Sequence, residues 1–306
     1  MSRIFAALLV ALLAWPAAGR AAPAGRPIIV SSKIDTEGAL LGNMILAVLA
    51  ANGLPVENRL MLGPTNILRA AILSGQIDIY PEYTGNGAFF FHRENDPAWK
   101  RRRPGYELVK KLDLQKNRLV WLTPAPADNS WVIAVRADLA HRHRLRTMED
   151  FARYVNGGGT IKLAASAEFV ESPAALPAFE KTYGFRLSDA QLVTLSGGNT
   201  AATERAAAER MAGVNAAMAY GTDGALLALG LVALADDKGA QIVYAPTPVV
   251  RQAVLERFPA IASTLAPVFA TLTVERLRRL NAAIAVQGEN AAAVAAASLK
   301  AEHLLP

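Results

Sequence analysis

From residue 27 onward, short apolar segments that suit β-strands alternate with longer segments that suit amphipathic helices. Strand patterns occur at 27–32, 56–62 and 77–80, and helical patterns fill the two intervals between them. The apolar positions of the first helical pattern are Leu40, Leu41, Met44, Ile45, Val48 and Leu49. Asp35 or Thr36 can cap the start of this helix. Alternating strands and helices predict a parallel sheet joined by right-handed crossovers, and therefore an α/β fold.

A second strand–helix set follows a turn-rich segment at 124–129, which reads as a linker. Its predicted strands are 130–135, 161–165, 192–195, 215–221 and 241–244. Pro246 and Pro248 then predict a crossing back, and the C-terminal third of the chain is helical in pattern. We therefore predict two α/β lobes that meet at a cleft. Lobe one comprises residues 27–128 plus 246–306, and lobe two comprises residues 129–245.

The segment 77–87 marks a strand exit in the first lobe. Its alternating start predicts a strand, Pro81 removes a ladder donor, and Gly85 and Gly87 supply turn freedom. Tyr83 is thereby placed at the carboxyl end of a strand, which is where ligands bind in open α/β sheets. The alternative for Tyr83 is a packing role, as for most tyrosines.

The first 24 residues have the features of a secretory signal peptide. Arg3 precedes an apolar run at 4–14, and small residues then allow cleavage near Ala22 or Ala24. The run is too short to span a bilayer. The chain has no cysteine, which excludes a disulfide and a lipid-bearing cysteine. We expect a soluble, exported chain in a bacterial periplasm.

Charge and motifs exclude several classes of function. Cleavage after Ala22 removes two of the 32 basic residues and none of the 26 acidic ones, so the mature chain carries a net charge of +4 and gives no argument for nucleic acid. His141 and His143 lack the carboxylate or cysteine support of a metal site. Nucleophile-elbow, zinc-protease, dinucleotide and phosphate-loop motifs are missing. We expect no catalytic residues, no metal and no cofactor. Glu82 and Asp223 can be read as an acid–base pair, or equally as residues that fix loops or bridge the lobes.

Four aromatic residues begin or end predicted strands near the proposed cleft: Tyr83, Trp131, Tyr220 and Tyr244. Each lies beside Gly, Pro, Ser or Asn rather than in an apolar stripe. Rings around a cavity suit a quaternary ammonium, which donates no strong hydrogen bond and is attracted to ring faces. Each ring contributes about 0.5–1 kcal/mol when exposed and about 2 kcal/mol when desolvated.

Several separated motifs give the chain a specific resemblance. They are the segments 32–38, 77–85, 219–224 and 236–238, together with 245–250. In this order they resemble the substrate-binding proteins of osmoprotectant ABC importers, which bind glycine betaine, choline, carnitine or related compounds. The likeness covers the mature chain from about Ile28 to the C-terminal helices, and is greatest to the enterobacterial periplasmic branch. It implies a two-lobed type II periplasmic binding protein that closes on its ligand.

The resemblance also implies a ligand-binding set. The cage rings of the family fall at Tyr83, Trp131, Tyr220 and Tyr244, with tryptophan where tyrosine is usual at residue 131. Lys33 matches a contact to the ligand carboxylate, and Asn86 matches a threonine that hydrogen-bonds the ligand. One departure is Ser172, which stands where betaine binders of this family place an arginine on the carboxylate.

The expected function is therefore capture of a quaternary ammonium osmoprotectant and its delivery to an ABC permease. The ATPase must be a separate subunit, because this chain has no phosphate-binding loop. We expect a monomer. The alternative is a ligand-sensing periplasmic protein for another cationic or zwitterionic small molecule.

Overall fold

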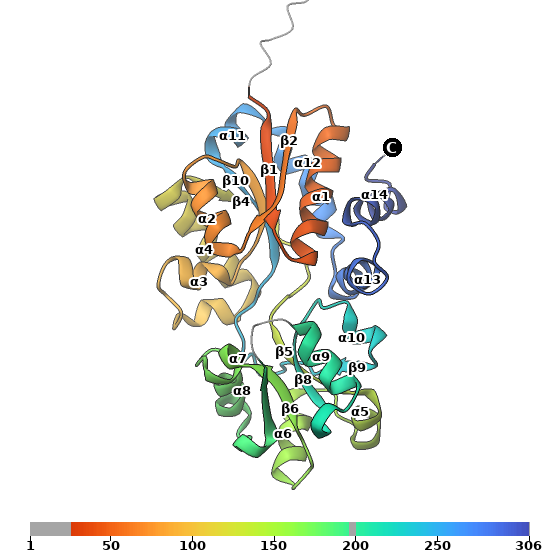
Figure 1. Cartoon of the computed structure of the whole chain (residues 1–306). Coiled ribbons are helices and arrows are strands. Elements are labelled where there is room, and N and C mark those ends of the chain that lie inside the picture. Colours follow the sequence, from red (N-terminus) through yellow and green to blue (C-terminus); the bar gives the residue numbers. More distant parts are fainter. Residues whose placement is uncertain (1–25, 196–199, 306) are drawn as a thin grey trace, which may run out of the picture.

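The computed structural model describes residues 26–195 and 200–305 and has two mixed sheets, one in each lobe (Figure 1). The predicted signal peptide lies outside these residues. The first sheet has the strand order β2-β1-β3-β10-β4, and its strands are β1 (Ile28–Lys33), β2 (Val56–Gly63), β3 (Ile79–Tyr83), β4 (Leu119–Trp121) and β10 (Pro246–Arg251). The second has the order β7-β6-β8-β5-β9, with β5 (Trp131–Arg136), β6 (Leu163–Ser166), β7 (Leu192–Leu195), β8 (Ala216–Tyr220) and β9 (Leu231–Ala233).

Helices cover both sheets. The helices of the first lobe are α1 (Thr36–Ala51), α2 (Thr65–Leu73), α3 (Asn86–Phe90), α4 (Arg102–Asn117), α11 (Gln252–Arg257), α12 (Ala260–Ala270), α13 (Val274–Ala285) and α14 (Ala291–Ala301). Those of the second are α5 (Ala137–His143), α6 (Met148–Asn156), α7 (Ala167–Glu171), α8 (Leu176–Tyr183), α9 (Thr200–Ala208) and α10 (Ala225–Ala228). Short 3-10 helices occur at η1 (Pro97–Lys100), η2 (Asp189–Gln191) and η3 (Met211–Gly213).

The core of the first lobe joins distant parts of the chain. The six apolar positions predicted for α1 are all buried, and α1 packs in one cluster with residues of α12, α13 and α14 such as Leu265, Leu277 and Leu299. Asp35 caps α1, because its side chain accepts a hydrogen bond from the N–H of Gly38 at 2.7 Å. None of the described helices is by itself long and apolar enough to span a membrane, and α12 with α13 meets that criterion only as a pair bent by 89°.

The two segments that connect the lobes lie side by side. The N–H of Tyr244 donates to Asp128 Oδ1 at 2.9 Å, and the N–H of Asn129 donates to the carbonyl of Tyr244 at 3.0 Å. Ser130 Oγ donates to the carbonyl of Ile242 at 2.6 Å. These bonds join the outgoing and returning chain at the level of the cleft.

The prediction that the strand at 77–80 stops at Pro81 is wrong, because β3 runs through Pro81 to Tyr83. In the antiparallel pair with β10, Pro81 lies opposite Pro248. Thr84 N–H donates to Ala245 O, and Arg251 N–H donates to Asp78 O, so the hydrogen-bonded pairs fall at even-numbered residues of β3. Both prolines therefore occupy non-hydrogen-bonded positions of this pair, so neither removes a hydrogen bond between β3 and β10.

One further prediction needs correction. Residues 241–244 form no strand, and the returning strand is instead β10, in the segment read as a crossing. The parallel arrangement predicted for the first three strands is confirmed, because β1 runs parallel to both β2 and β3. Each complete sheet is nevertheless mixed, because β10 runs antiparallel to β3 and β4, and β5 runs antiparallel to β8 and β9. These antiparallel strands pair with neighbours that are distant in sequence, which a local pattern does not reveal.

Candidate functional site

The cleft between the lobes consists of two connected chambers. Chamber one, of about 600 Å³, lies between the β1–α1 loop, α9, the segment after β8, and α13. Chamber two, of about 810 Å³, lies between α2, α3, β5 and the segment from α7 to α8. Thr65, Asn86, Asn129, Tyr220 and Tyr244 line both chambers. The shared walls make this one continuous cleft with sides from both lobes.

The four predicted rings all line this cleft, but in different places. Tyr83 lines chamber one, Trp131 lines chamber two, and Tyr220 and Tyr244 line both. Trp131 on β5 is the register partner of Tyr220 on β8, and their ring centroids are 4.5 Å apart. Sheet pairing therefore holds two of the rings together on the second lobe.

Tyr244 belongs to the returning connection and is positioned by a glycine. A Cβ on Gly85 would lie 2.8 Å from the Tyr244 ring and 2.7 Å from Ile242, which is closer than real contacts allow. Only glycine at this position lets the loop after β3 approach the ring. The glycine read from sequence as a turn residue thus brings Tyr244 against the first lobe.

Lys33 and Asn86 meet at a single carboxylate, Glu82. Lys33 Nζ is 2.6 Å from Glu82 Oε1, and Asn86 Nδ2 donates to the same oxygen at 2.7 Å. Tyr80 OH donates to the other oxygen at 3.1 Å. Glu82 is 0% exposed and Lys33 7% exposed. Both predicted ligand contacts therefore line the cleft, but each already bonds to a buried internal acid.

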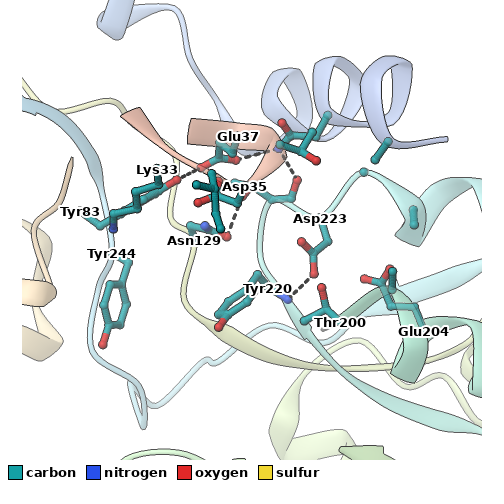
Figure 2. Close-up of a pocket in the computed structure, with 18 of the residues that line it drawn as sticks. Lys33, Asp35, Glu37, Tyr83, Asn129, Thr200, Glu204, Tyr220, Asp223 and Tyr244 are labelled. Atoms are coloured by element: carbon teal, nitrogen blue, oxygen red, sulfur yellow. Dashed lines mark hydrogen bonds between the residues drawn. The ribbon is translucent and has the colours of Figure 1, made fainter. Parts of the chain in front are cut away.

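Glu37 is a second buried acid, at the meeting of the lobes. Tyr83 OH donates to Glu37 Oε1 at 2.7 Å, and Asn281 Nδ2 donates to Glu37 Oε2 at 2.7 Å. Burial raises the pKa of Glu37 to about 7, while hydrogen bonds from Thr222, Tyr83 and Asn281 oppose that rise. Figure 2 shows Glu37 beside Lys33 and Asp35 on the wall of the cleft.

A coupled acid pair, Glu204 and Asp223, forms part of the wall of chamber one. Burial raises the pKa of Glu204 to about 9, and the neighbouring charge of Asp223 adds to the shift. The side chain of Asp223 accepts from the N–H of Tyr220 at 2.8 Å, which fixes the turn after β8. In Figure 2 Asp223 lies between Tyr220 and Glu204.

The cleft carries more acidic than basic side chains. Asp35, Glu37, Glu204 and Asp223 line chamber one and Glu168 lines chamber two, whereas the basic residues among the described lining are Lys33 and Arg69. Arg69 forms a two-bond fork with Asp113, at 2.7 and 2.8 Å. Since both cations are already paired, the remaining acids favour a cationic ligand electrostatically, with Glu204 contributing least because burial raises its pKa to about 9.

Ser172 lines chamber two, together with Asn86 and Trp131. It follows the last residue of α7, and its Oγ accepts from the N–H of Ala174 at 3.4 Å. Arg69 lines the same chamber but is held by Asp113. The described lining of this chamber therefore has no free guanidinium for an anionic group.

The lining residues that sequence reasoning missed include Glu37, Glu204 and Asn281. The sequence pattern marks two of them, Asn281 and Glu204, as polar residues within buried helix faces. Asn281 follows Leu277 by four residues on α13, so it is a polar residue within a buried stripe, and Glu204 lies among the buried alanines of α9. Glu82 and Asp223 do not form an acid–base pair, because each bonds within its own lobe. No group of three or more metal-ligating side chains occurs in the described part of the chain.

We predict that Glu37 makes stability depend on pH. Its pKa rises from 4.5 to about 7 on folding, so the unfolded chain ionises first as pH increases. The free energy of unfolding should fall between pH 4.5 and pH 7 by up to roughly 3 kcal/mol from this group. In Glu37→Gln this pH-dependent part of the unfolding free energy should be missing, which urea unfolding at several pH values measures. Glu57→Gln is the control, because the Glu57 side chain is 40% exposed, and parallel wild-type and Glu37→Gln curves would contradict the prediction.

Comparisons with known proteins agree with this architecture. A family model described as the substrate binding domain of ABC-type glycine betaine transport system matches residues 26–301. The glycine betaine-binding protein YehZ of Escherichia coli (strain K12) is 59% identical over 277 residues, which cover 90% of this chain and 91% of YehZ. The structure of apo YehZ from Escherichia coli superposes with a TM-score of 0.83 and covers 91% of this chain and 99% of that one.

A more distant structure, of a glycine betaine/carnitine/choline ABC transporter, is 19% identical and superposes with a TM-score of 0.79. It covers 90% of this chain and 99% of that chain. At that identity the likeness shows the fold alone, which is the two-lobed periplasmic binding protein fold.

Proposed function

This chain belongs to the family of substrate-binding domains of ABC-type glycine betaine transport systems, and we propose that it captures a quaternary ammonium osmoprotectant in the interlobe cleft. The observation that carries the proposal is the position of Tyr220 and Tyr244, which line both chambers of an acidic cleft. Members of this family are components of ABC importers, in which the binding protein works with a permease and an ATPase. The family is one of transport proteins and not of enzymes.

The ligand is held, in this proposal, by the rings of Tyr83, Trp131, Tyr220 and Tyr244. The methyl groups of a quaternary ammonium cannot donate strong hydrogen bonds, so ring faces in a water-poor cleft are its best partners. The rings come from both lobes, so closure completes the cage and ligand shifts the population toward the closed state. The nearby carboxylates add long-range attraction for the cation.

Lys33 and Asn86 are proposed to bind an anionic end of the ligand. Each now donates to Glu82, so a ligand carboxylate has to share or displace that acid. A like charge beside a buried carboxylate is unfavourable. We therefore expect the carboxylate of a zwitterion to contribute less affinity here than the ammonium end.

The proposal extends to the location of the chain, its oligomeric state and the boundaries of its lobes. The chain is exported to the periplasm with cleavage near Ala22 or Ala24, and acts as a monomer that delivers ligand to the permease. The lobes are residues 27–128 plus 246–306 and residues 129–245. The membership of the two sheets and the paired connections at 128–130 and 242–244 support these boundaries.

The test of the proposed function is calorimetry of the mature chain with glycine betaine, choline, carnitine and ectoine. Intrinsic fluorescence supplies a second readout, since Trp99 and Trp121 are each 1% exposed and Trp131 lines the cleft. We expect saturable binding of at least one trimethylammonium compound with a fluorescence change that Trp131→Phe abolishes. Binding of none of the trimethylammonium compounds would reject the function.

Ser172→Arg should raise the affinity for glycine betaine relative to choline by roughly ten- to a hundredfold. Arginine offers a carboxylate a planar pair of charged donors, whereas serine offers one neutral hydroxyl. Calorimetry of both ligands with both proteins gives the ratio, and Glu171→Gln, at the exposed neighbouring residue, controls for altered charge. An unchanged betaine-to-choline ratio would show that residue 172 does not contact the ligand carboxylate.

A further inference from the structure

The turn that begins at Tyr220, directly after β8, is held by both lobes. Within the second lobe, the N–H of Tyr220 donates to Asp223 at 2.8 Å. Thr222 Oγ1 donates to Asn129 Oδ1 at 2.7 Å, which ties the turn to the outgoing connection between the lobes. Further contacts come from α13 of the first lobe, which lies directly above α10 of the second lobe in Figure 1 and is in contact with it.

Two side chains of α13 reach the backbone of this turn. Arg278 Nε donates to the carbonyl of Gly221 at 2.7 Å. Asn281 Nδ2 donates to the carbonyl of Thr222 at 3.0 Å. A bond from a guanidinium to a carbonyl is charge-assisted and stronger than a bond between neutral groups. Because the two acceptors directly follow Tyr220, the first lobe fixes the backbone beside a ring that belongs to the second lobe.

Gly224 shows how closely the two lobes approach at this point. A Cβ on Gly224 would lie 2.2 Å from the backbone nitrogen of Ala282 and 2.5 Å from the carbonyl carbon of Asn281, which is closer than real contacts allow. The φ of −72° and ψ of −29° at Gly224 are open to any residue. Glycine is therefore required here by the contact with α13 and not by the backbone conformation.

The amide of Asn281 extends this contact to Tyr83. Its Nδ2 also donates to Glu37 Oε2 at 2.7 Å, so both N–H groups of the amide are used. Tyr83 OH donates to the other oxygen of Glu37 at 2.7 Å. A continuous chain of hydrogen bonds therefore runs from the Tyr83 phenol through Glu37 and Asn281 to the turn that begins at Tyr220. Asn281 and Glu37 are both 5% exposed, so bulk water does not readily replace these bonds.

We propose that Arg278 and Asn281 are positioning residues of the ligand site: they hold the Tyr220 turn of the second lobe against the first lobe, so that Tyr83 and Tyr220 keep a fixed relative position before a ligand arrives. The inference rests on the proposed function and adds the residues that arrange its site. Arg278 is not among the described residues that line either chamber, so it acts on the ligand only through this turn. Positioning matters for affinity, because apparent affinity falls in proportion to the fraction of molecules that is competent to bind.

Variants on the two sides of the contact test the inference. Arg278→Gln and Gly224→Ala should each weaken the binding of glycine betaine and of choline by roughly tenfold in calorimetry, because the competent arrangement is no longer the dominant one. Arg279→Gln, at the exposed next position of α13, controls for the loss of one positive charge and should bind like the wild type. Arg278→Lys keeps a charged donor and should recover most of the affinity.

A measurement without ligand separates positioning from general stability. The chain has no native cysteine, so Glu107→Cys and Lys181→Cys place one spin label on each lobe, at exposed residues of α4 and α8. We expect the distribution of distances between the two labels to be broader in Arg278→Gln and Gly224→Ala than in the wild type and in Arg279→Gln. Thermal unfolding confirms that each variant folds, and Arg278→Gln decides alone if Gly224→Ala does not.

The two measurements distinguish failure of this inference from failure of the proposed function. If Arg278→Gln binds both ligands as tightly as the wild type, the positioning role is overturned, whatever the width of its distance distribution, and the proposed function stands. If the wild type binds no trimethylammonium compound, the proposed function fails. The distance distributions then decide whether α13 fixes the turn, and equal widths in Arg278→Gln and the wild type would reject it.

Discussion

Tyr220→Ala is expected to weaken binding of every quaternary ammonium ligand by roughly thirtyfold, which corresponds to about 2 kcal/mol for a desolvated ring. Tyr220 lines both chambers, so its ring is available wherever the cation settles in the cleft. Its loss also leaves Trp131 without the ring that lies 4.5 Å from it. A reoriented Trp131 should add to the loss of affinity rather than compensate for it.

Calorimetry with glycine betaine and choline measures this effect, and Tyr220→Phe is the matched control. Phenylalanine keeps the ring and its contact with Trp131, so its affinity should stay within about threefold of the wild type. Trp131→Ala should also weaken binding, while thermal unfolding confirms that each variant folds. Affinities for both ligands that survive Tyr220→Ala would reject the aromatic cage.

Glu82→Ala is expected to lower the free energy of unfolding by about 3–5 kcal/mol, because it leaves Lys33 as a buried charge without its partner. The same change removes the acceptor of Tyr80 OH and Asn86 Nδ2. Glu82 lies in β3, at the centre of the first sheet, and is 0% exposed. Water therefore cannot replace the lost carboxylate cheaply. Urea denaturation of the wild type and of Glu82→Ala measures this difference in the free energy of unfolding.

Glu57→Ala is the matched control for Glu82→Ala. Glu57 is also a strand glutamate of the first sheet, and it pairs with Arg59 at 2.7 Å. The Glu57 and Arg59 side chains are 40% and 47% exposed, so this pair should contribute at most about 1 kcal/mol. If the two variants lose similar amounts of unfolding free energy, burial of Glu82 is not the reason for the large effect that we predict.

Local features of the fold could be predicted because they depend on neighbours in sequence. The apolar stripe predicted for α1 is buried as expected, and Thr147 caps α6 through a capping box with Asp150. Gly184 ends α8 with a φ of 69°, a conformation that favours glycine. Each of these signals acts over one or two helical turns, so the residues that decide it are adjacent in the chain.

The end of β3 and the position of β10 were predicted wrongly because they depend on residues that are distant in sequence. Pro81 and Pro248 look like strand breakers one at a time, yet they are register partners at positions where β3 and β10 exchange no hydrogen bond. Their separation in sequence hides that pairing. The antiparallel direction of β10 is likewise set by the path of the chain back from the second lobe.

By itself, the sequence determined the apolar stripe and cap of α1, the two strand–helix sets and the aromatic residues at strand ends, because periodicity and turn chemistry are local. Tertiary structure alone decided which polar groups meet. Asn281 hydrogen-bonds Glu37, which is 244 residues away in sequence. Lys33 forms a salt bridge with Glu82. Tertiary structure also divided the rings between two chambers and joined the turn after β8 to α13. Burial and long-range contact set these pairings, and no local pattern in the chain encodes either.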